Sequence, residues 1–282
     1  MTRGIVIAAP QSGAGKTTIT LGLMRALARQ FQVVPFKIGP DYIDPSFHQV
    51  ASKNEPHNLD LFLLGEDNLK KIFFYAAQTG DMAIVEGVMG LFDGLGTESW
   101  GSTAQVAKIL QLPVVLVIDV RSMLTSAAAL VHGFQTYDPE LQLVGIICNL
   151  TSSQGHYAQI KESIERDCNL PVIGNLPFKK FLVLPERHLG LITSWETSNL
   201  DRWLDHCADF LLKNINIQQL IDLMVPLENR KIDFFNQFIF SQSEKIRIGV
   251  AYDQAFHFYY SDSLAAFRFS GAELVYFSPL QD

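Results

Sequence analysis

A glycine-rich loop, APQSGAGKTT (9–18), lies between an apolar run at 4–9 and an amphipathic run at 17–29. Such a loop between a strand and a helix is typical of a Walker A motif, in which backbone N–H groups and the helix N-terminus surround phosphates. Gly13 and Gly15 allow close backbone approach, although Pro10 stands where the motif expects glycine. The chain is therefore expected to bind a nucleotide.

The end of this loop carries the expected chemistry. Lys16 would reach the β- and γ-phosphates, and the Thr17 hydroxyl would be a ligand of Mg²⁺. The alternative is a glycine-rich turn with a chance Gly-Lys-Thr, but the flanking strand and helix favour the nucleotide site. The predicted nucleotide-binding residues here are Gly13, Ala14, Gly15, Lys16, Thr17 and Thr18.

Strand-like apolar runs alternate with helical patterns along the first 195 residues. The runs are nearly continuous in apolarity, as expected of strands covered on both faces. This alternation predicts an α/β fold with a mostly parallel, twisted sheet flanked by helices, of the P-loop NTPase type. Strands are predicted at 4–9, 33–38, 82–86, 114–120, 143–150 and 171–174, and helices at 17–29, 68–78, 102–110, 122–134 and 154–168.

The pattern changes after about residue 195. Helical runs at 200–212 and 217–224 precede a polar stretch at 228–245, which is interpreted as a linker. A strand, a helix and a second strand then follow, as at the opening of another α/β domain that stops too early to close its own core. The predicted parts are a nucleotide-binding domain (1–195), a helical extension and linker (196–244), and the start of a second domain (245–282).

Charge and composition limit the partners. The formal net charge of -7 argues against nucleic acid and anionic membranes, since both require a basic surface. No apolar run approaches the length of a membrane span, and the start of the chain lacks a secretory signal pattern. Three widely spaced cysteines without a C-x-x-C pair indicate a reducing compartment and no zinc site. A cytoplasmic protein is expected.

Carboxylates follow two of the predicted strands. Glu86 ends the run at 82–86, and Asp93 follows in the glycine-rich loop VEGVMGLFDG. A carboxylate at a strand end beside a P-loop is the usual second anchor for Mg²⁺, whereas the alternatives are a solvent-facing strand end and a loop residue without a role. Asp41 and Asp44, in KIGPDYIDP, could be turn formers. Because carboxyl ends of parallel strands share one edge, we instead expect a nucleotide–metal site with a substrate pocket beside it.

Several motifs together resemble those of one family. The chain is similar to the cobyrinic acid a,c-diamide synthase family and, more loosely, to the wider group of dethiobiotin-synthetase-like and MinD/ParA-like P-loop proteins. The combination of GPDYIDP, VEGVMGLFDG and PERHLGL is specific to the diamide synthases, including those that amidate nickel sirohydrochlorin or hydrogenobyrinic acid. The matching motifs are SGAGKTT, KIGPDYIDPSFH, NLD, VEGVMGLFDG, GSTAQVAKILQLPVVLVID, SAAALVHGF and PERHLGL.

The resemblance implies an enzyme, an ATP-dependent carbon–nitrogen ligase of cobalamin biosynthesis. Family members use ATP and Mg²⁺ to activate the a and c acetate carboxylates of a tetrapyrrole as acyl phosphates, which ammonia converts to amides. Such a site must neutralise a triphosphate and a carboxylate, a task for Lys16, Mg²⁺ and cations such as Lys37. The implied partners are a tetrapyrrole substrate and an ammonia source, and a homodimer is left open.

The resemblance also implies roles for individual residues. Lys16 and Thr17 would bind phosphate and Mg²⁺, with Glu86 as a metal anchor. Asn149 would read adenine, or alternatively cap a strand end, and a lone loop histidine such as His188 is alternatively structural. Metal, substrate or intermediate handling is implied for Asp41, Tyr42, Asp44 and Asp93, with Asp44 also a metal ligand, and contacts to substrate carboxylates or nucleotide for Arg187 and His188.

The chain departs from the family in its glutaminase part. Family members carry a C-terminal glutaminase domain with a Cys–His pair, and KIRIGVAYDQAFHFYYSD resembles its opening. Cys148, Cys168 and Cys207 lack the sharp strand-to-helix turn of a nucleophile. The chain is interpreted as a synthetase domain with a truncated glutaminase domain, a fragment or a shortened gene product, without glutamine hydrolysis. Residues 246–282 should be poorly ordered or sticky unless they dock on the first domain or on another copy.

Two other functions are alternatives to the ligase. A MinD/ParA-like switch ATPase usually has an additional lysine early in its P-loop, where this chain has Gln11. A dethiobiotin-synthetase-like carboxylate-activating enzyme fits GPDYIDP and PERHLGL less well.

Overall fold

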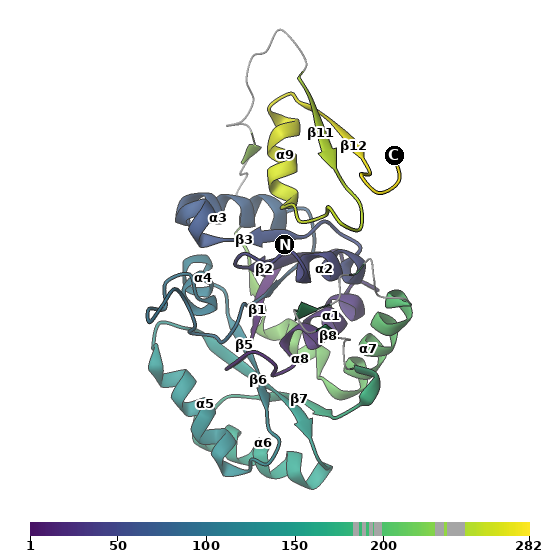
Figure 1. Ribbon diagram of the computed structural model, residues 1–282. Helices are drawn as coiled ribbons and strands as arrows, with labels where there is room; N and C mark the ends of the chain where they lie inside the picture. Colours follow the sequence, from purple (N-terminus) through teal and green to yellow (C-terminus); the bar gives the residue numbers. More distant parts are fainter. Residues whose placement is uncertain (183–185, 188–189, 192–193, 195–198, 229–233, 236–245) are drawn as a thin grey trace.

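The computed structural model describes residues 1–182, 186–187, 190–191, 194, 199–228, 234–235 and 246–282. Its main body is built on an eight-stranded sheet, in which seven parallel strands run in the order β3-β2-β4-β1-β5-β6-β7 (Figure 1). A short strand, β10 (Val225–Pro226), pairs antiparallel with β1. The parallel strands are β1 (Arg3–Ala8), β2 (Val33–Ile38), β3 (His57–Leu59), β4 (Met82–Glu86), β5 (Val114–Asp119), β6 (Leu143–Thr151) and β7 (Val172–Pro177).

Helices cover both faces of this sheet, which confirms the predicted α/β fold. Along β1, Ile5 and Ile7 enter one apolar core and Val6 and Ala8 the other, following the two-residue period of a strand. Both faces are buried, so the strands are apolar throughout. The helices are α1 (Lys16–Leu27), α2 (Asp44–Ser52), α3 (Leu61–Ala77), α4 (Thr103–Leu110), α5 (Thr125–Tyr137), α6 (Gln154–Cys168), α7 (Leu200–Asn214) and α8 (Ile217–Leu223).

Two short elements depart from the sequence-based expectation. The sequence predicts a loop for the GPDYIDP segment, but Asp44 is the first residue of α2. Pro45 is tolerated in the first turn, because backbone N–H groups at that position make no hydrogen bond within the helix. The three-residue strand β3 was not predicted, since His57 and Asn58 interrupt its apolarity. Both elements lie at the β2 side of the sheet and shape the edge where the predicted carboxylates lie.

Helix α3 begins with a separate first turn. The carboxylate of Asp60 accepts hydrogen bonds from the backbone N–H groups of Phe62 and Leu63, which are free at a helix start. Gly65 then adopts φ 68° and ψ 170°, a conformation open essentially to glycine, and the helix is kinked there. The turn before Gly65 is therefore set apart from the buried body of α3.

Helix α7 packs against α1, the helix that follows the glycine-rich loop. A Cβ built on Gly22 would lie 2.6 Å from a methyl carbon of Leu211, so α1 and α7 approach closely at this glycine. The guanidinium of Arg25 also donates to Asp205 over 2.8 Å. Residues 200–214 thus extend the body that contains the glycine-rich loop.

The C-terminal segment, residues 246–282, docks on this body. It holds two parallel strands, β11 (Arg247–Ala251) and β12 (Glu273–Phe277), with α9 (Ser261–Phe269) between them in the chain (Figure 1). Helix α9 packs near β3, where His57 Nδ1 lies 2.8 Å from an Asp262 oxygen.

Residues 180–191 add a 3-10 turn (Lys180–Leu182) and two short strands, β8 (Glu186–Arg187) and β9 (Gly190–Leu191). Among the described residues, none of the helices has the length and apolarity required to span a bilayer.

Candidate active site

The glycine-rich loop joins β1 to α1 at the carboxyl edge of the sheet. Gly13 and Gly15 have φ values of 80° and 90°, in the left-handed region that favours glycine. A Cβ on Gly15 would also lie 2.2 Å from Asn149 Nδ2. That amide nitrogen donates to the carbonyl of Ala14 over 2.9 Å, so Asn149, near the end of β6, holds the loop backbone.

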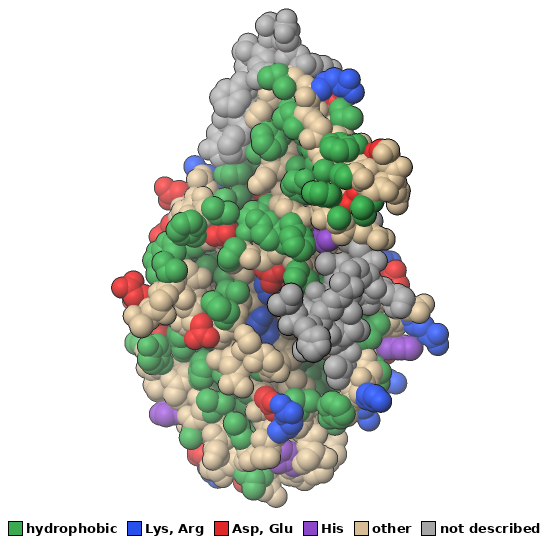
Figure 2. Space-filling view, viewed as in Figure 1, with side chains coloured by type: hydrophobic (Ala, Val, Ile, Leu, Met, Phe, Trp, Pro, Cys, Tyr) green, Lys and Arg blue, Asp and Glu red, His purple; other side chains and the backbone are tan. Residues whose placement is uncertain are grey.

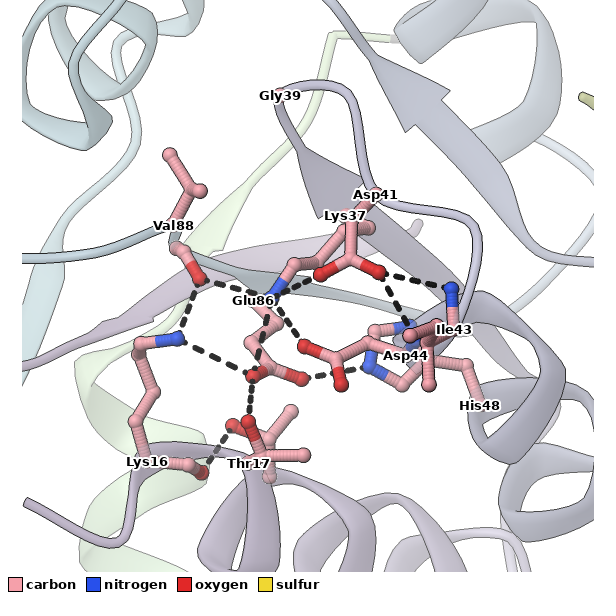
Figure 3. A network of polar contacts seen from close by, with 12 residues as sticks. Lys16, Thr17, Lys37, Gly39, Asp41, Ile43, Asp44, His48, Glu86 and Val88 are labelled. Carbon is pink, nitrogen blue, oxygen red and sulfur yellow. Dashed lines mark hydrogen bonds and ion pairs between the residues drawn. The ribbon is translucent and has the colours of Figure 1, made fainter. Parts of the chain in front are cut away.

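Charged side chains converge beside this loop (Figure 3). They come from the start of α1, the ends of β2 and β4, and the start of α2, which all meet at one edge of the sheet. Lys37 and Glu86 are direct partners in the register of β2 and β4. The acid–lysine cluster comprises Lys16, Thr17, Lys37, Asp41, Asp44, His48 and Glu86. The expected convergence of Asp41, Asp44 and Glu86 near Lys16 is therefore observed.

Glu86 is the centre of the cluster and is fully buried. Its Oε1 accepts from Thr17 Oγ1 over 2.6 Å and from the Nζ atoms of Lys16 and Lys37 over 3.2 Å each. Its Oε2 lies 2.6 Å from His48 Nε2. Burial alone would raise the pKa of Glu86, but Lys37, Lys16 and His48 hold that pKa well below its ordinary value. Glu86 is thus an ionised carboxylate inside the protein.

Lys37 is a buried cation among three carboxylates. Its Nζ lies 2.5 Å from Asp44 Oδ2, 3.2 Å from Glu86 Oε1 and 3.5 Å from Asp41 Oδ2. Burial lowers its pKa, but Glu86, Asp44 and Asp41 raise it more, and the net pKa is raised. The neighbouring Lys16 also donates to Gly87 O over 2.6 Å, and burial lowers its pKa. The site thus has one permanently charged lysine and one more easily deprotonated lysine.

Asp41 has a structural task as well as an electrostatic one. Its Oδ1 accepts from the backbone N–H groups of Ile43 and Asp44, over 2.9 and 3.0 Å, at the start of α2. The same carboxylate pairs with Lys37 through Oδ2. Asp41 therefore both forms the turn before α2 and belongs to the acid–lysine cluster.

His48 is a residue of the cluster that the sequence-based reasoning missed. It is fully buried on α2, and its Nδ1 has no hydrogen-bond partner among the described residues. Since ionised Glu86 can only accept, Nε2 carries the proton and donates to Oε2. His48 follows Asp44 by four residues, the spacing that puts two side chains on one helix face, and this signal could have found it.

Residues 5–192 match the protein family described as the CobQ/CobB/MinD/ParA nucleotide binding domain. The chain belongs to this family. It is 46% identical to a cobyrinate a,c-diamide synthase of Caldanaerobacter subterraneus over all of this chain and 62% of that protein. A protein of the same name from Streptococcus sanguinis is 45% identical over 98% of this chain and 61% of its own length. The chain thus spans about three fifths of the curated relatives it matches.

Solved structures that are similar over part of this chain were also found. The septum site-determining protein MinD of Pyrococcus horikoshii, in complex with Mg-ADP, is 16% identical, covers 64% of this chain and 83% of its own, and has a TM-score of 0.44. A ParA family ATPase of Chlorobium tepidum is 14% identical over 64% of this chain and 85% of its own, with a TM-score of 0.42.

A pocket of about 250 Å³ adjoins the glycine-rich loop of this nucleotide-binding domain. Gly13, Gly15 and Thr18 line one side of it, and Asn149 and Arg121 contribute from the ends of β6 and β5. We propose this pocket as the place for a base and ribose beside the loop. The amide of Asn149 is engaged with Ala14 and with the N–H of Leu150, so reading a base would require it to exchange these partners.

Other predicted site residues lie apart from the cluster. Asp93 Oδ2 accepts from the N–H of Gly90 over 2.9 Å within its own loop, and no described contact joins it to the cluster. Tyr42 stacks on Tyr260 instead of entering the cluster. Arg187 lies on β8 but its side chain is outside the described parts, and His188 lies outside the described residues altogether.

The three cysteines are buried, as expected of structural residues. Burial raises the pKa of Cys148 and of Cys207 to about 12, and it also raises that of Cys168. A nucleophilic cysteine requires the opposite shift.

Asp44 gives the isolated protein a pH-dependent stability. Burial, with Glu86 adding to it, raises the pKa of Asp44 from 3.8 to about 6, against the attraction of Lys37. The folded state therefore binds this proton more tightly than the unfolded state, so the stabilisation is complete below the unfolded pKa and is lost as the pH rises through about 6. From about pH 4 to about pH 7, the unfolding free energy should fall relative to that of Asp44→Asn by up to about 3 kcal/mol. Urea unfolding without nucleotide or Mg²⁺ measures this, and a pH-independent difference would refute it.

Proposed function

We propose that this chain activates carboxylates of cobyrinic acid, or of a closely related tetrapyrrole acid, with ATP and Mg²⁺ for conversion to amides. The observation that carries the proposal is the pair of lysines whose Nζ atoms both lie 3.2 Å from Glu86 Oε1 beside the glycine-rich loop. Two cations there suit a reaction between a triphosphate and a carboxylate, which repel each other. The names of the relatives, cobyrinate a,c-diamide synthase, agree with it.

The chemistry proceeds in two steps. An oxygen of the substrate carboxylate attacks the γ-phosphorus, the bond to the β-phosphate oxygen breaks, and ADP leaves. Ammonia then attacks the acyl carbon, and phosphate leaves with the oxygen that bonded to phosphorus, while the nitrogen loses a proton. Lys16 would contact the transferred phosphoryl group, and Lys37 would face the incoming carboxylate. The two lysines would thus neutralise both anions while these are held in line for attack.

The donor set of the cluster fits Mg²⁺. Thr17 Oγ1 and Glu86 Oε1 are hard oxygen donors 2.6 Å apart, and Asp44 Oδ2 accepts a hydrogen bond from Lys37 Nζ. Mg²⁺ takes one or two carboxylates together with phosphate oxygens and water, so a hydroxyl and a carboxylate are a sufficient protein donor set. The ion would supply charge neutralisation on the phosphates. Thr17 and Glu86 would hold it.

An isotope experiment tests this proposal. The purified chain is incubated with ATP, Mg²⁺, ammonium chloride at raised pH and cobyrinic acid labelled with ¹⁸O in its carboxyl groups. We expect one labelled oxygen in inorganic phosphate for each amide formed, because the carboxyl oxygen leaves with phosphorus. With glutamine in place of ammonium we expect no amide, since the cysteines of the chain are buried with raised pKa values.

Three results would contradict these expectations. Unlabelled phosphate would exclude an acyl phosphate, and ATP hydrolysis that no tetrapyrrole acid accelerates would favour a switch ATPase. Amide formation with glutamine alone would show that one of the three cysteines acts as a nucleophile.

A further inference from the structure

An apolar pocket of about 550 Å³ lies next to the acid–lysine cluster. Its walls come from the GPDYIDP loop, the first turn of α3, the loop after β4, and the C-terminal segment. Figure 2 shows hydrophobic side chains gathered where the C-terminal segment meets the main body. The pocket lining includes Asp41, Tyr42, Asp60, Leu63, Val88, Trp100 and Tyr260.

The pocket opens toward the reacting groups. Asp41, which pairs with Lys37, lines it, and so does Val88, which follows the Gly87 carbonyl that accepts from both lysines. No lysine or arginine is among its lining residues in the described part of the chain. A ligand with a broad apolar face could therefore lie in the pocket with one carboxylate directed at the cluster.

Large apolar side chains at its rim are exposed. Phe62 is 75% exposed and Leu63 is 61% exposed, on the first turn of α3, and Leu95 is 67% exposed on the facing loop. A contiguous exposed apolar surface beside a polar site marks a binding site. The pocket volume of about 550 Å³ falls within the range of small-molecule binding pockets.

Tyr260 brings the C-terminal segment into this wall. Its ring stacks on Tyr42 with a centroid distance of 4.7 Å, and its hydroxyl donates to Asp60 Oδ2 over 3.1 Å. The other oxygen of Asp60 accepts from the N–H groups of Phe62 and Leu63. One side chain thus joins the GPDYIDP loop, the first turn of α3 and residues 246–282.

We propose that this pocket binds the flat face of the tetrapyrrole acid, and that Tyr260 is the positioning residue that holds its wall through Tyr42 and Asp60. The proposal rests on the function proposed above. It makes residues 246–282 part of substrate binding in the nucleotide-binding domain. Removing Tyr260 should weaken binding of the macrocycle without changing how ATP binds.

The fluorescence of Trp100 measures binding, because a tetrapyrrole bound in the pocket quenches it. The probe is hydrogenobyrinic acid, titrated into the full chain, and Trp100→Phe identifies the part of the quenching that arises in the pocket. Tyr260→Ala should raise the Kd about tenfold and Tyr260→Phe, which keeps the ring, by about threefold or less. Leu63→Glu, which adds a negative charge at the rim, should raise the Kd at least about tenfold.

Kinetics separate positioning from general damage. For Tyr260→Ala, the KM for the tetrapyrrole should rise in parallel with the Kd, while the KM for ATP and kcat at saturation stay within about twofold of wild type. Phe267→Ala is the matched control, since Phe267 is an exposed aromatic residue of α9 that does not line the pocket. It should leave both KM values unchanged.

The outcomes are distinct. Wild-type Kd values in both Tyr260→Ala and Leu63→Glu, in a chain that still forms amides, would overturn this inference and leave the proposed function standing. A wild-type chain that neither binds nor amidates any tetrapyrrole acid would overturn both. A rise in the KM for ATP equal to that for the macrocycle would reduce Tyr260 to a structural residue.

Discussion

The variant Lys16→Ala should lose at least about a thousandfold in ATP hydrolysis, to below detection. Lys16 is the cation at the start of α1, and its Nζ donates to Glu86 and to the Gly87 carbonyl beside the glycine-rich loop. The fold should persist, because Glu86 keeps Thr17, Lys37 and His48 as partners. Released phosphate measures turnover, and circular dichroism measures folding.

A surface lysine gives the matched control for this experiment. Lys161 lies on α6 with a half-exposed side chain paired to Glu165, far along the sheet from the glycine-rich loop. Lys161→Ala should retain wild-type turnover. Wild-type turnover in Lys16→Ala would rule out the P-loop assignment itself.

The variant Lys37→Met should lower the free energy of unfolding by about 3–5 kcal/mol and abolish amide formation. Removing this buried cation leaves Asp41, Asp44 and Glu86 without their shared partner. The cost comes from uncompensated charge inside the protein, since methionine fills a similar volume. Urea unfolding at neutral pH measures the loss.

A double variant shows whether charge is the cause. Lys37→Met combined with Asp44→Asn removes one carboxylate along with the lysine, so it should be more stable than Lys37→Met alone. If both variants are equally unstable, packing around Lys37 accounts for the loss and the electrostatic explanation fails.

The fold could be predicted from the sequence where apolar runs and turn chemistry agree. The strands at Val33–Ile38 and Met82–Glu86 have the predicted bounds, because both faces are buried and no polar residue interrupts them until the site. The sequence does not predict helix α2, because Asp, Gly and Pro, which dominate the segment before it, are common in turns. In the folded chain the carboxylate of Asp41 accepts from the backbone N–H groups of Ile43 and Asp44, where the helix begins.

The residues of the site that belong to local sequence motifs could be predicted. Lys16, Thr17, Asp44 and Glu86 follow from strand ends sharing one edge of a parallel sheet. Tyr260 could not, because its partner Asp60 lies 200 residues away in the chain and no local pattern encodes that contact. The helix at 200–212 is predicted from the sequence, but its packing on α1 is not, because that packing depends on the tertiary fit of Leu211 against Gly22.

The glycine kink in α3 bears on how binding preferences can diverge. Gly65 separates the turn that carries Phe62 and Leu63 from the helix body, where Leu69, Ile72 and Phe73 are buried in the core. Substitutions at the two exposed positions touch little of that core and should change folding stability by about half a kcal/mol or less. Related chains could therefore differ at this rim and still keep the acid–lysine cluster intact.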